Sequence, residues 1–309
     1  MSLLLIAPDR QLSSWEKTIR KIDPHIEVAI WPAIPNKEQV QFAVCWNQPK
    51  HVLDSFPNLK AVSSLGAGAD HLLSDESLPE SVEICRIVSP SLVQQMKEYI
   101  IGAVISIRRH FTKYIRQKDQ QQWQVHTHGE VSGTRIGVMG LGAIGKPAAR
   151  QLARMGYSVS AWSRTPKNVQ DIRCFAGPDQ LVNFLKKAEI LICLLPLTEE
   201  TEDILDLELF KQLPSPGWII NVARGDHLVD EDLIYALDSH LLQGAWLDVF
   251  SEEPLPDKHP FWNRSNIIMT PHIASITPPE EAAEQIVENY KRALSGMSLK
   301  NAVDRALGY

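Results

Sequence analysis

The sequence is poor in the features that mark disulfide-rich, metal-binding and membrane-spanning proteins. Its 309 residues include four cysteines, which are widely spaced and form no CxxC pair. This spacing favours buried, reduced thiols over disulfides or a metal centre. No apolar run approaches the roughly 20 residues that span a bilayer, and the short apolar start at residues 1–7 carries no basic leader. We therefore expect a cytoplasmic protein whose first residues form a strand rather than a signal peptide.

An excess of positive charge is also missing. The chain has 31 Lys and Arg against 37 Asp and Glu, which gives a formal net charge of -6. Nucleic acids and anionic membranes attract proteins through basic faces, so neither is an expected partner. A content of 44% hydrophobic and 22% charged residues is typical of a globular protein. The length exceeds the usual domain size of about 100–200 residues and favours two domains.

Short apolar runs alternate with helical patterns along the chain, which indicates parallel α/β sheets. Strands are predicted at 3–7, 26–30, 42–46, 61–64 and 82–87, and a second series at 136–139, 158–162, 190–195, 218–222, 244–247 and 267–269. One long helix is predicted from Ser91 to Lys118. Another amphipathic helix follows Pro271 and is expected to return to the first domain.

This order of elements predicts two Rossmann-like doubly wound parallel-sheet domains with a cleft between them. The substrate-binding (catalytic) domain is expected to be discontinuous and to comprise residues 1–98 and 276–309. Residues 99–275 are expected to form the dinucleotide-binding domain.

A glycine motif follows the strand predicted at 136–139. Gly140, Gly142 and Gly145, with Ala143 and Ile144 between the last two, separate this strand from a helical segment. The first glycine permits a tight turn, the second lets the backbone approach a pyrophosphate, and the third lets the helix pack on the strand. The helix amino terminus supplies an anion site, so the motif predicts a bound dinucleotide.

The acid that binds the adenosine ribose of NAD is absent from the end of the next predicted strand. Ser163, Arg164 and Thr165 stand there instead, with Lys167 nearby. An acid would repel a 2′-phosphate, whereas an arginine can bind it with two hydrogen bonds. We therefore predict NADPH (NADP) as the cofactor, and the alternative is a solvated surface arginine.

Three segments at the ends of late strands supply groups for reducing a keto acid. They contain Arg224, Glu253 and His272. Such a reaction needs a cation to hold the carboxylate and an acid to protonate the incipient alkoxide. Arg224 and His272 fit these roles, and a carboxylate favours the proton-donating form of the imidazole. Glu253 is the candidate partner, with Glu252 as the alternative.

In these motifs the sequence closely resembles the D-isomer-specific 2-hydroxyacid dehydrogenase family. That family carries an Arg-Gly pair, an Asp-Val-Phe segment ending in Glu-Pro and a Thr-Pro-His triplet in this order, here at 224–225, 248–254 and 270–272. The resemblance spans nearly the whole chain. Cys45-Trp46 and the segments 65–70, 161–164 and 303–309 make it most similar to bacterial glyoxylate/hydroxypyruvate reductases of the A type.

The resemblance implies roles for further residues. Arg224, Glu253 and His272 would be the catalytic residues. The backbone of Gly66, Ala67 and Gly68, together with Trp46 and Arg224, would bind the substrate. Leu195, Pro196, Thr198, Val222 and Asp248 would contact the cofactor, with Asp248 on the nicotinamide carboxamide. The family usually forms homodimers.

Simpler structural roles remain open for several of these residues. Trp46 could belong to the core, Gly66 and Gly68 could form only a turn, and Asp248 could cap the turn that follows it. His126 and His128 lie close together, but their flanks lack further ligands, so we expect no metal there.

We therefore expect NADPH-dependent reduction of glyoxylate to glycolate and of hydroxypyruvate to D-glycerate, with His272 as the proton donor. The alternatives are a reductase of 2-keto acids with other side chains and a nucleotide-sensing interaction protein on the same fold.

Overall fold

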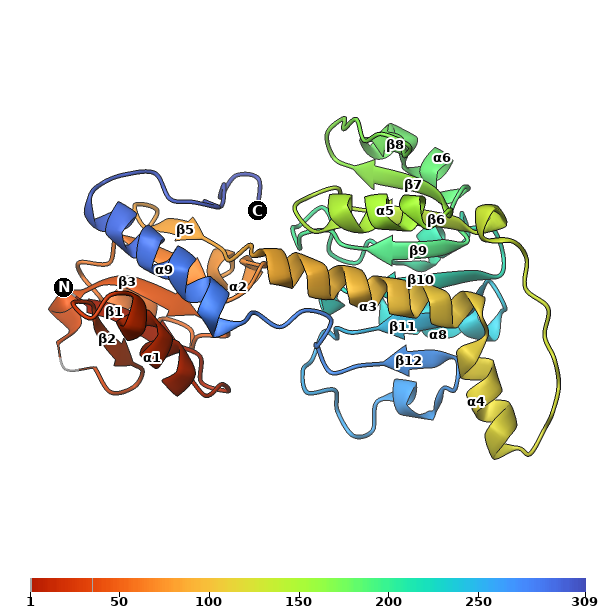
Figure 1. Cartoon of the computed structure of the whole chain (residues 1–309), viewed down its shortest axis with the longest axis horizontal. Coiled ribbons are helices and arrows are strands. Elements are labelled where there is room, and N and C mark those ends of the chain that lie inside the picture. The colour runs from red at the N-terminus through yellow and green to blue at the C-terminus, as the bar shows by residue number, and fades with distance from the viewer. Residues whose placement is uncertain (1, 35) are drawn as a thin grey trace. The chain divides into compact units, whose positions relative to one another are not determined.

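The computed structural model describes residues 2–34 and 36–309 of the chain, which divides into two compact units. Unit 1 comprises Met1–Leu92 and Ile276–Tyr309, and unit 2 comprises Val93–Ser275. Each unit is built on its own parallel sheet with helices on both faces (Figure 1). The chain is thus an α/β protein with two doubly wound sheets, which confirms the predicted fold class.

Unit 1 contains a five-stranded sheet in the order β2-β1-β3-β4-β5. Its strands are β1 (Ser2–Ile6), β2 (Glu27–Ile30), β3 (Val40–Cys45), β4 (Ala61–Ser64) and β5 (Glu83–Cys85). Helices α1 (Ser13–Ile22) and α9 (Pro279–Leu294) cover one face together, and the short α2 (Asp70–Leu73) lies on the other. Helix α9 buries Ala282, Ile286 and Tyr290 against this sheet, so the end of the chain completes the core of unit 1.

Unit 2 contains a seven-stranded sheet in the order β12-β11-β10-β9-β6-β7-β8. Its strands are β6 (Arg135–Met139), β7 (Ser158–Ser163), β8 (Arg173–Ala176), β9 (Ile190–Cys193), β10 (Gly217–Asn221), β11 (Leu242–Leu247) and β12 (Ile267–Met269). Its helices are α3 (Pro90–Arg108), which begins in unit 1, α4 (Phe111–Asp119), α5 (Gly145–Arg154), α6 (Leu181–Leu185), α7 (Leu207–Phe210) and α8 (Asp230–Asp238). Short 3-10 helices of the chain are η1 (Lys37–Gln39), η2 (Leu53–Ser55), η3 (Val131–Gly133), η4 (Pro178–Gln180), η5 (Gly225–His227) and η6 (Pro260–Asn263).

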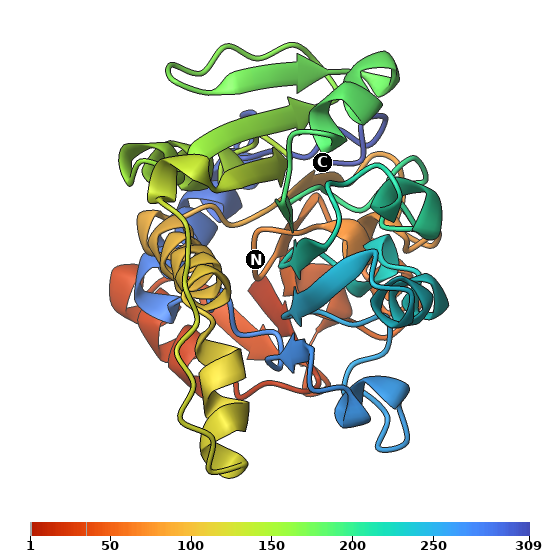
Figure 2. The same cartoon turned by 90° about the vertical axis from the view of Figure 1, so that its right-hand side faces the viewer.

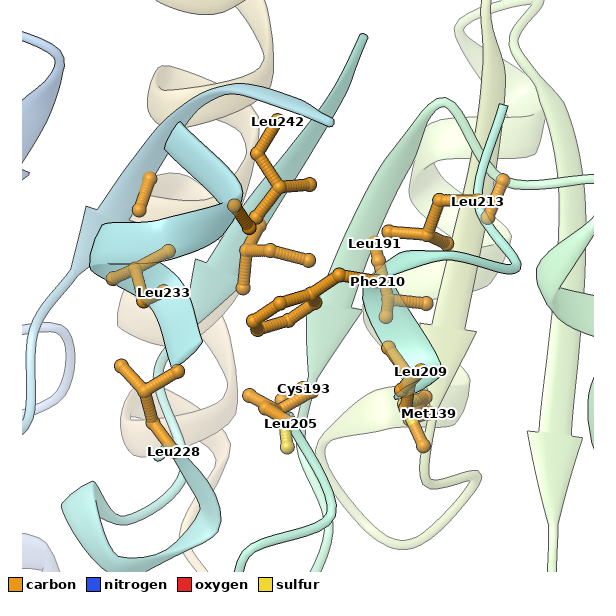
Figure 3. Packing of buried hydrophobic residues seen from close by; sticks show 14 of the residues in the cluster. Met139, Leu191, Cys193, Leu205, Leu209, Phe210, Leu213, Leu228, Leu233 and Leu242 are labelled. Atoms are coloured by element: carbon orange, nitrogen blue, oxygen red, sulfur yellow. The ribbon is translucent and has the colours of Figure 1, made fainter. Parts of the chain in front are cut away.

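Two apolar layers hold the sheet of unit 2 between its helices. Helices α3 and α5 cover one face, and α6, α7 and α8 cover the other, so gold α3 and cyan α8 appear on opposite sides of the sheet in Figure 2. Phe210 is fully buried in the second layer, where its ring lies among Leu191, Leu233 and Leu242 (Figure 3). These layers fix the strands, and hence the loops that leave their carboxyl ends.

Two details of the fold differ from the sequence prediction. Strand β8 was not expected, because the short segment Arg173–Ala176 at the edge of the sheet has an exposed arginine and no long apolar run. The helix predicted from Ser91 to Lys118 is interrupted at His110, whose φ of 57° is left-handed. The buried apolar face of the first helix ends at Ile107. Arg108, which is half-buried, and Arg109, which is exposed, follow it and supply no apolar surface whose burial would keep the helix continuous.

Most of the thiols are buried in the cores of the two units. Three of the four unbridged cysteines are buried, and burial raises the pKa of Cys85 to about 11 and of Cys193 to about 12. These thiols therefore stay protonated near neutral pH. Within residues 2–34 and 36–309, no helix combines the length and apolar character that crossing a bilayer requires.

Candidate active site

The glycine motif lies at the point where the strand order of unit 2 reverses. Strands β6 and β9 are neighbours there, and the loops that follow them carry Gly140 and Leu194. Gly140 has a φ of 100°, and a Cβ atom at this position would lie 2.6 Å from the carbonyl oxygen of Leu194. Ligands of open α/β sheets bind at this type of switch point.

The space around the other two glycines fits a pyrophosphate. A Cβ atom on Gly145 would lie 1.9 Å from the carbonyl oxygen of Gly140, so only glycine lets α5 start this close to β6. Around Gly142, by contrast, a Cβ atom would meet nothing within 4 Å. Within the described part of the chain, no acceptor pairs with the N–H groups of Gly142, Ala143 or Ile144. The loop therefore offers backbone donors and open space where a phosphate group can bind.

The end of β7 presents Ser163, Arg164 and Thr165. The Ser163 hydroxyl donates to the carbonyl oxygen of Thr165 over 2.9 Å and so shapes this turn. Arg164 forms an ion pair with Glu200, with 3.6 Å between Nη1 and Oε2. The Glu200 side chain is 71% exposed, and exposed pairs contribute at most about 1 kcal/mol. A phosphate that binds Arg164 can therefore displace Glu200 at small cost.

This pair predicts how two substitutions change cofactor affinity. Replacing Arg164 with alanine should weaken NADPH binding about 10- to 100-fold, because charge-assisted hydrogen bonds to the phosphate are lost, and should leave NADH binding unchanged. Replacing Glu200 with glutamine removes the competing carboxylate and should strengthen NADPH binding by up to about 5-fold. Fluorescence titration of both cofactors measures these effects. Equal losses of NADH and NADPH affinity in Arg164→Ala would contradict a phosphate contact.

A buried histidine, His227, links the loop after β9 to the residues after β10. Leu195 is buried, Pro196 and Thr198 are half-buried, and Val222 is buried directly after β10. His227 is fully buried, and its ring nitrogens lie 3.1 Å from the carbonyl oxygen of Arg224 and 3.2 Å from that of Pro196. Sequence reasoning missed His227, whose ring bridges the two loops.

Arg224 is held in place by hydrogen bonds to two neighbouring residues. Its carbonyl oxygen accepts a hydrogen bond of 2.8 Å from Asn221 Nδ2, and its Nη1 donates to the carbonyl oxygen of Ala223 over 2.7 Å. The following residue, Gly225, packs directly on the peptide that joins Phe250 to Ser251. The Arg-Gly pair thus brings the arginine beside the segment that leads to Glu253.

His272 and Glu253 form a direct pair. The Nδ1 atom of His272 lies 2.8 Å from Oε2 of Glu253, whose other carboxylate oxygen accepts a 3.0 Å hydrogen bond from the backbone N–H of Phe250. Burial works to raise the pKa of Glu253, but these hydrogen bonds and the charges of His272 and Arg224 together hold it below its usual value. Glu253 is therefore ionised near neutral pH. Between the two candidate carboxylates, the structure pairs the histidine with Glu253 rather than Glu252.

The His272 turn is built on Asp248. His272 has a φ of 53°, a left-handed conformation that costs energy for a residue other than glycine. Its N–H donates to the carbonyl oxygen of Asp248 over 2.8 Å, and the Asp248 carboxylate accepts from the N–H groups of Ile273 and Ala274 over 2.9 and 2.7 Å. Asp248 therefore caps the turn that presents His272, and its predicted contact with the nicotinamide remains a prediction.

The loop after β4 in unit 1 contains the residues expected to hold the substrate carboxylate. Ser64 Oγ accepts a 3.2 Å hydrogen bond from the N–H of Gly66. For the N–H groups of Ala67 and Gly68, the described ranges 2–34 and 36–309 contain no acceptor. Trp46 follows β3 and is half-buried against the apolar layer of α1 and α9. The Trp46 side chain thus contributes to the core of unit 1 and is also partly exposed at the carboxyl ends of the strands.

Comparison with known proteins places this geometry in a family. The model of the NAD-binding domain of D-isomer-specific 2-hydroxyacid dehydrogenases matches residues 101–274. Over the full length of both chains, the protein is 36% identical to glyoxylate/hydroxypyruvate reductase A of Yersinia enterocolitica and 37% identical to that of Photorhabdus laumondii. This chain belongs to the D-isomer-specific 2-hydroxyacid dehydrogenase family.

Solved structures of the same family superpose closely on the chain. A D-isomer-specific 2-hydroxyacid dehydrogenase from Xanthobacter autotrophicus, in complex with NADPH and MES, has a TM-score of 0.95 and 37% identity, with 100% of this chain and 99% of that chain covered. An NADPH-dependent glyoxylate/hydroxypyruvate reductase from Sinorhizobium meliloti, in complex with NADP and sulfate, has a TM-score of 0.92 and 31% identity, with both chains fully covered.

A hydrogen-bonded chain behind the His272 turn of this dehydrogenase was not foreseen from the sequence. Trp246 Nε1 donates to the Tyr99 hydroxyl over 2.9 Å, Tyr99 is bonded to Thr270 Oγ1, and Thr270 Oγ1 donates to Asp248 Oδ1 over 2.6 Å. An indole N–H can only donate and an ionised carboxylate can only accept. Both hydroxyls therefore donate in the direction of Asp248. Burial raises the pKa of Asp248, and the hydrogen bonds from Thr270 and from the N–H groups of Ile273 and Ala274 oppose that rise.

Removing the Tyr99 hydroxyl tests the contribution of this chain to stability. Replacing Tyr99 with phenylalanine leaves the indole N–H of Trp246 without its acceptor and should lower the free energy of unfolding by about 1–3 kcal/mol. Urea denaturation measures this change. Tyr235 is 57% exposed, and Tyr235→Phe, as the matched control, should change stability by less than about 0.5 kcal/mol. Equal effects of the two substitutions would show that the Tyr99 bonds contribute nothing.

The histidine pair near the start of unit 2 has local partners. His126 Nδ1 lies 3.2 Å from Lys113 Nζ, and its ring packs at 5.6 Å from that of Tyr114. Across residues 2–34 and 36–309, no group of three or more His, Cys, Asp or Glu side chains is arranged to hold a metal ion. The absence of a metal site at His126 and His128 stays a prediction.

Proposed function

We propose that this dehydrogenase uses NADPH to reduce glyoxylate to glycolate and hydroxypyruvate to D-glycerate. The observation that carries the proposal is the 2.8 Å contact between His272 and an ionised Glu253. This pair lies on loops at the carboxyl edge of the sheet that also carries the glycine motif. The names of the relatives from Yersinia enterocolitica and Photorhabdus laumondii support the same substrates.

The residues of unit 2 provide a cation and an acid for this reaction. Arg224 binds the substrate carboxylate and polarises the carbonyl group, because its positive charge stabilises the oxygen as negative charge develops there. His272 donates a proton from Nε2 to that oxygen, since its Nδ1 is held by Glu253. The ionised carboxylate of Glu253 accepts a hydrogen bond from Nδ1 and so fixes the plane of the ring.

The cofactor residues fit a phosphorylated dinucleotide. The bound cofactor supplies a hydride to the carbonyl carbon. The free N–H groups at Gly142 and Ala143 suit the pyrophosphate, and Arg164 suits the 2′-phosphate because its present partner, Glu200, is largely exposed. In unit 1, the N–H groups of Ala67 and Gly68 suit the substrate carboxylate.

Steady-state kinetics test the proposal directly. Initial rates with glyoxylate, hydroxypyruvate and pyruvate are measured with NADPH and with NADH. We expect turnover of the first two substrates and a higher kcat/KM with NADPH. Absence of turnover on all three keto acids would exclude the enzyme function, and a preference for NADH would exclude the assigned role of Arg164.

A further inference from the structure

Unit 1 has a strand-order reversal of its own. In the order β2-β1-β3-β4-β5, the connections from β1 and β3 leave toward opposite sides of the sheet, so the reversal lies between these two neighbouring strands. Ligands of doubly wound sheets bind beyond the carboxyl ends of the strands at such a point. Arg10 lies in the loop after β1, and Trp46 directly follows β3. These two residues therefore flank the switch point of unit 1.

Arg10 stacks on Trp46 and makes no polar side-chain contact. Its backbone N–H donates to the carbonyl oxygen of Ala7 over 3.1 Å, which closes a turn after β1. Its Cζ atom lies 4.3 Å from the centre of the Trp46 ring system. In the part of the chain that the structure describes, the guanidinium forms no hydrogen bond and no ion pair. Arginine keeps its charge in proteins, so the edge of this guanidinium offers several N–H donors to a ligand.

The Trp46 ring joins Arg10 to the loop that suits a carboxylate. A Cβ atom on Gly66 would lie 2.9 Å from Cζ3 of Trp46, so glycine is needed for this close contact. The ring of His71 lies 5.3 Å from that of Trp46 and helps to fix it. The N–H groups of Ala67 and Gly68, which follow Gly66, have no acceptor among the described residues. The Trp46 ring thus contacts both the Arg10 guanidinium and the loop that carries the N–H groups of Ala67 and Gly68. Both sets of donors lie beyond the carboxyl ends of the strands of unit 1.

We propose that Arg10 is a specificity-determining residue that binds an oxygen carried by C3 of the keto acid, while Ala67 and Gly68 bind the C1 carboxylate. The preferred substrate class is then 2-keto acids with an oxygen-bearing third carbon, such as hydroxypyruvate or the keto dicarboxylate mesoxalate. This inference rests on the proposed function, because it assigns the substituent of the same substrate. Glyoxylate has no third carbon, so Arg10 contributes nothing to its binding. Pyruvate places a methyl group against the charged donors and gains no hydrogen bond from them.

Replacing Arg10 with methionine tests the assignment while keeping an apolar contact on the Trp46 ring. We expect kcat/KM to fall about 10-fold or more for hydroxypyruvate and mesoxalate, because a charge-assisted hydrogen bond is lost. The value for glyoxylate should change by less than about 2-fold. The matched control is Lys21→Ala, which removes one positive charge from the last turn of α1. Helix α1 runs back from the Arg10 loop, so Lys21 lies toward the amino ends of the strands. Replacing Lys21 should therefore affect no substrate selectively.

Two results would overturn the inference. Equal losses of kcat/KM for glyoxylate and hydroxypyruvate would show that Arg10 binds the carboxylate that both substrates share, or that it only stabilises the fold. No loss for either substrate would show that the stacking of Arg10 on Trp46 has only a structural role. Calorimetric titration with tartronate, which has two carboxylates, and glycolate, which has one, separates this inference from the proposed function. If the wild type turns over no keto acid, a loss of tartronate affinity confined to Arg10→Met still supports the Arg10 site. Equal tartronate affinity in the two proteins would reject it.

Discussion

Replacing His272 with alanine should lower kcat for glyoxylate and hydroxypyruvate by about 10²- to 10⁴-fold, the range that general acid catalysis contributes. The substitution removes the proton donor together with its 2.8 Å contact to Glu253. The KM for NADPH should change little, because the glycine motif and Arg164 lie on other loops. Stopped-flow and steady-state rates with NADPH measure the loss. A variant with more than about a tenth of the wild-type kcat would exclude His272 as the donor.

The pH dependence of the rate provides a second test of the His272 pair. Reduction needs a protonated imidazole, so the wild-type rate should fall as the pH rises, and this fall should vanish in His272→Ala. Because the pKa of Glu253 is held low, its carboxylate stays ionised through the neutral range. Protonation of Glu253 would remove the acceptor that holds Nδ1 of His272, so the rate should also fall at acidic pH, below the usual titration range of a glutamate, and Glu253→Gln should abolish this acidic fall. The same acidic fall in wild type and Glu253→Gln would contradict the role of this carboxylate.

His259 provides the control for these substitutions. It lies in unit 2, and its Nε2 is 3.1 Å from a carboxylate oxygen of Asp230, so it resembles His272 in having an acidic partner. It precedes η6, where its Nδ1 atom caps the helix by accepting a hydrogen bond from the N–H of Phe261. His259→Ala should therefore change kcat by less than about 2-fold, although it removes one His–carboxylate pair from the same unit. A loss of kcat comparable to that of His272→Ala would mean that both substitutions lower the rate by disturbing the fold of unit 2.

The sequence was most informative where one local pattern determines one local structure. Gly140 and Gly145 could be recognised because a strand, a tight turn and a helix need small residues at this spacing, and the structure contains all three elements. The strand-ending segments that contain Arg224 and His272 were found in the same way. Strand β8 was missed because an edge strand has less apolar surface to bury, and its four residues carry little periodic signal.

The supports of the candidate site were harder to predict because they connect distant parts of the chain. Tyr99 and Thr270 are 171 residues apart in sequence, and the bond between them depends on how α3 packs on the sheet. His227 likewise joins two loops through backbone carbonyl oxygens, which exist at every residue and leave no sequence signal. Arg10 and Trp46 meet only because β1 and β3 are neighbours in the sheet. Such partners follow from topology and packing rather than from a local motif.

Replacing Gly225 with alanine should reduce kcat/KM by at least about 100-fold and lower the free energy of unfolding by about 3 kcal/mol, the upper end of the cost of overpacking. A Cβ atom there would lie 1.8 Å from the carbonyl carbon of Phe250 and 2.1 Å from the backbone nitrogen of Ser251. These are main-chain atoms, so no side-chain rotation can relieve the overlap. The two segments must move apart, which separates Arg224 from Glu253. Rates with hydroxypyruvate and urea denaturation measure the two effects.

Two further variants show whether the overlap at Gly225 is the cause. Adding Phe250→Ala to Gly225→Ala should restore neither activity nor stability, because the phenyl ring is not what the new methyl group meets. Gly102 lies on α3 with nothing within 4 Å of its Cβ position. Gly102→Ala should therefore leave the rate unchanged and raise stability by about 0.5–1 kcal/mol through helix propensity. Recovery of activity in the double variant would show that the Phe250 side chain, rather than the backbone, restricts this position to glycine.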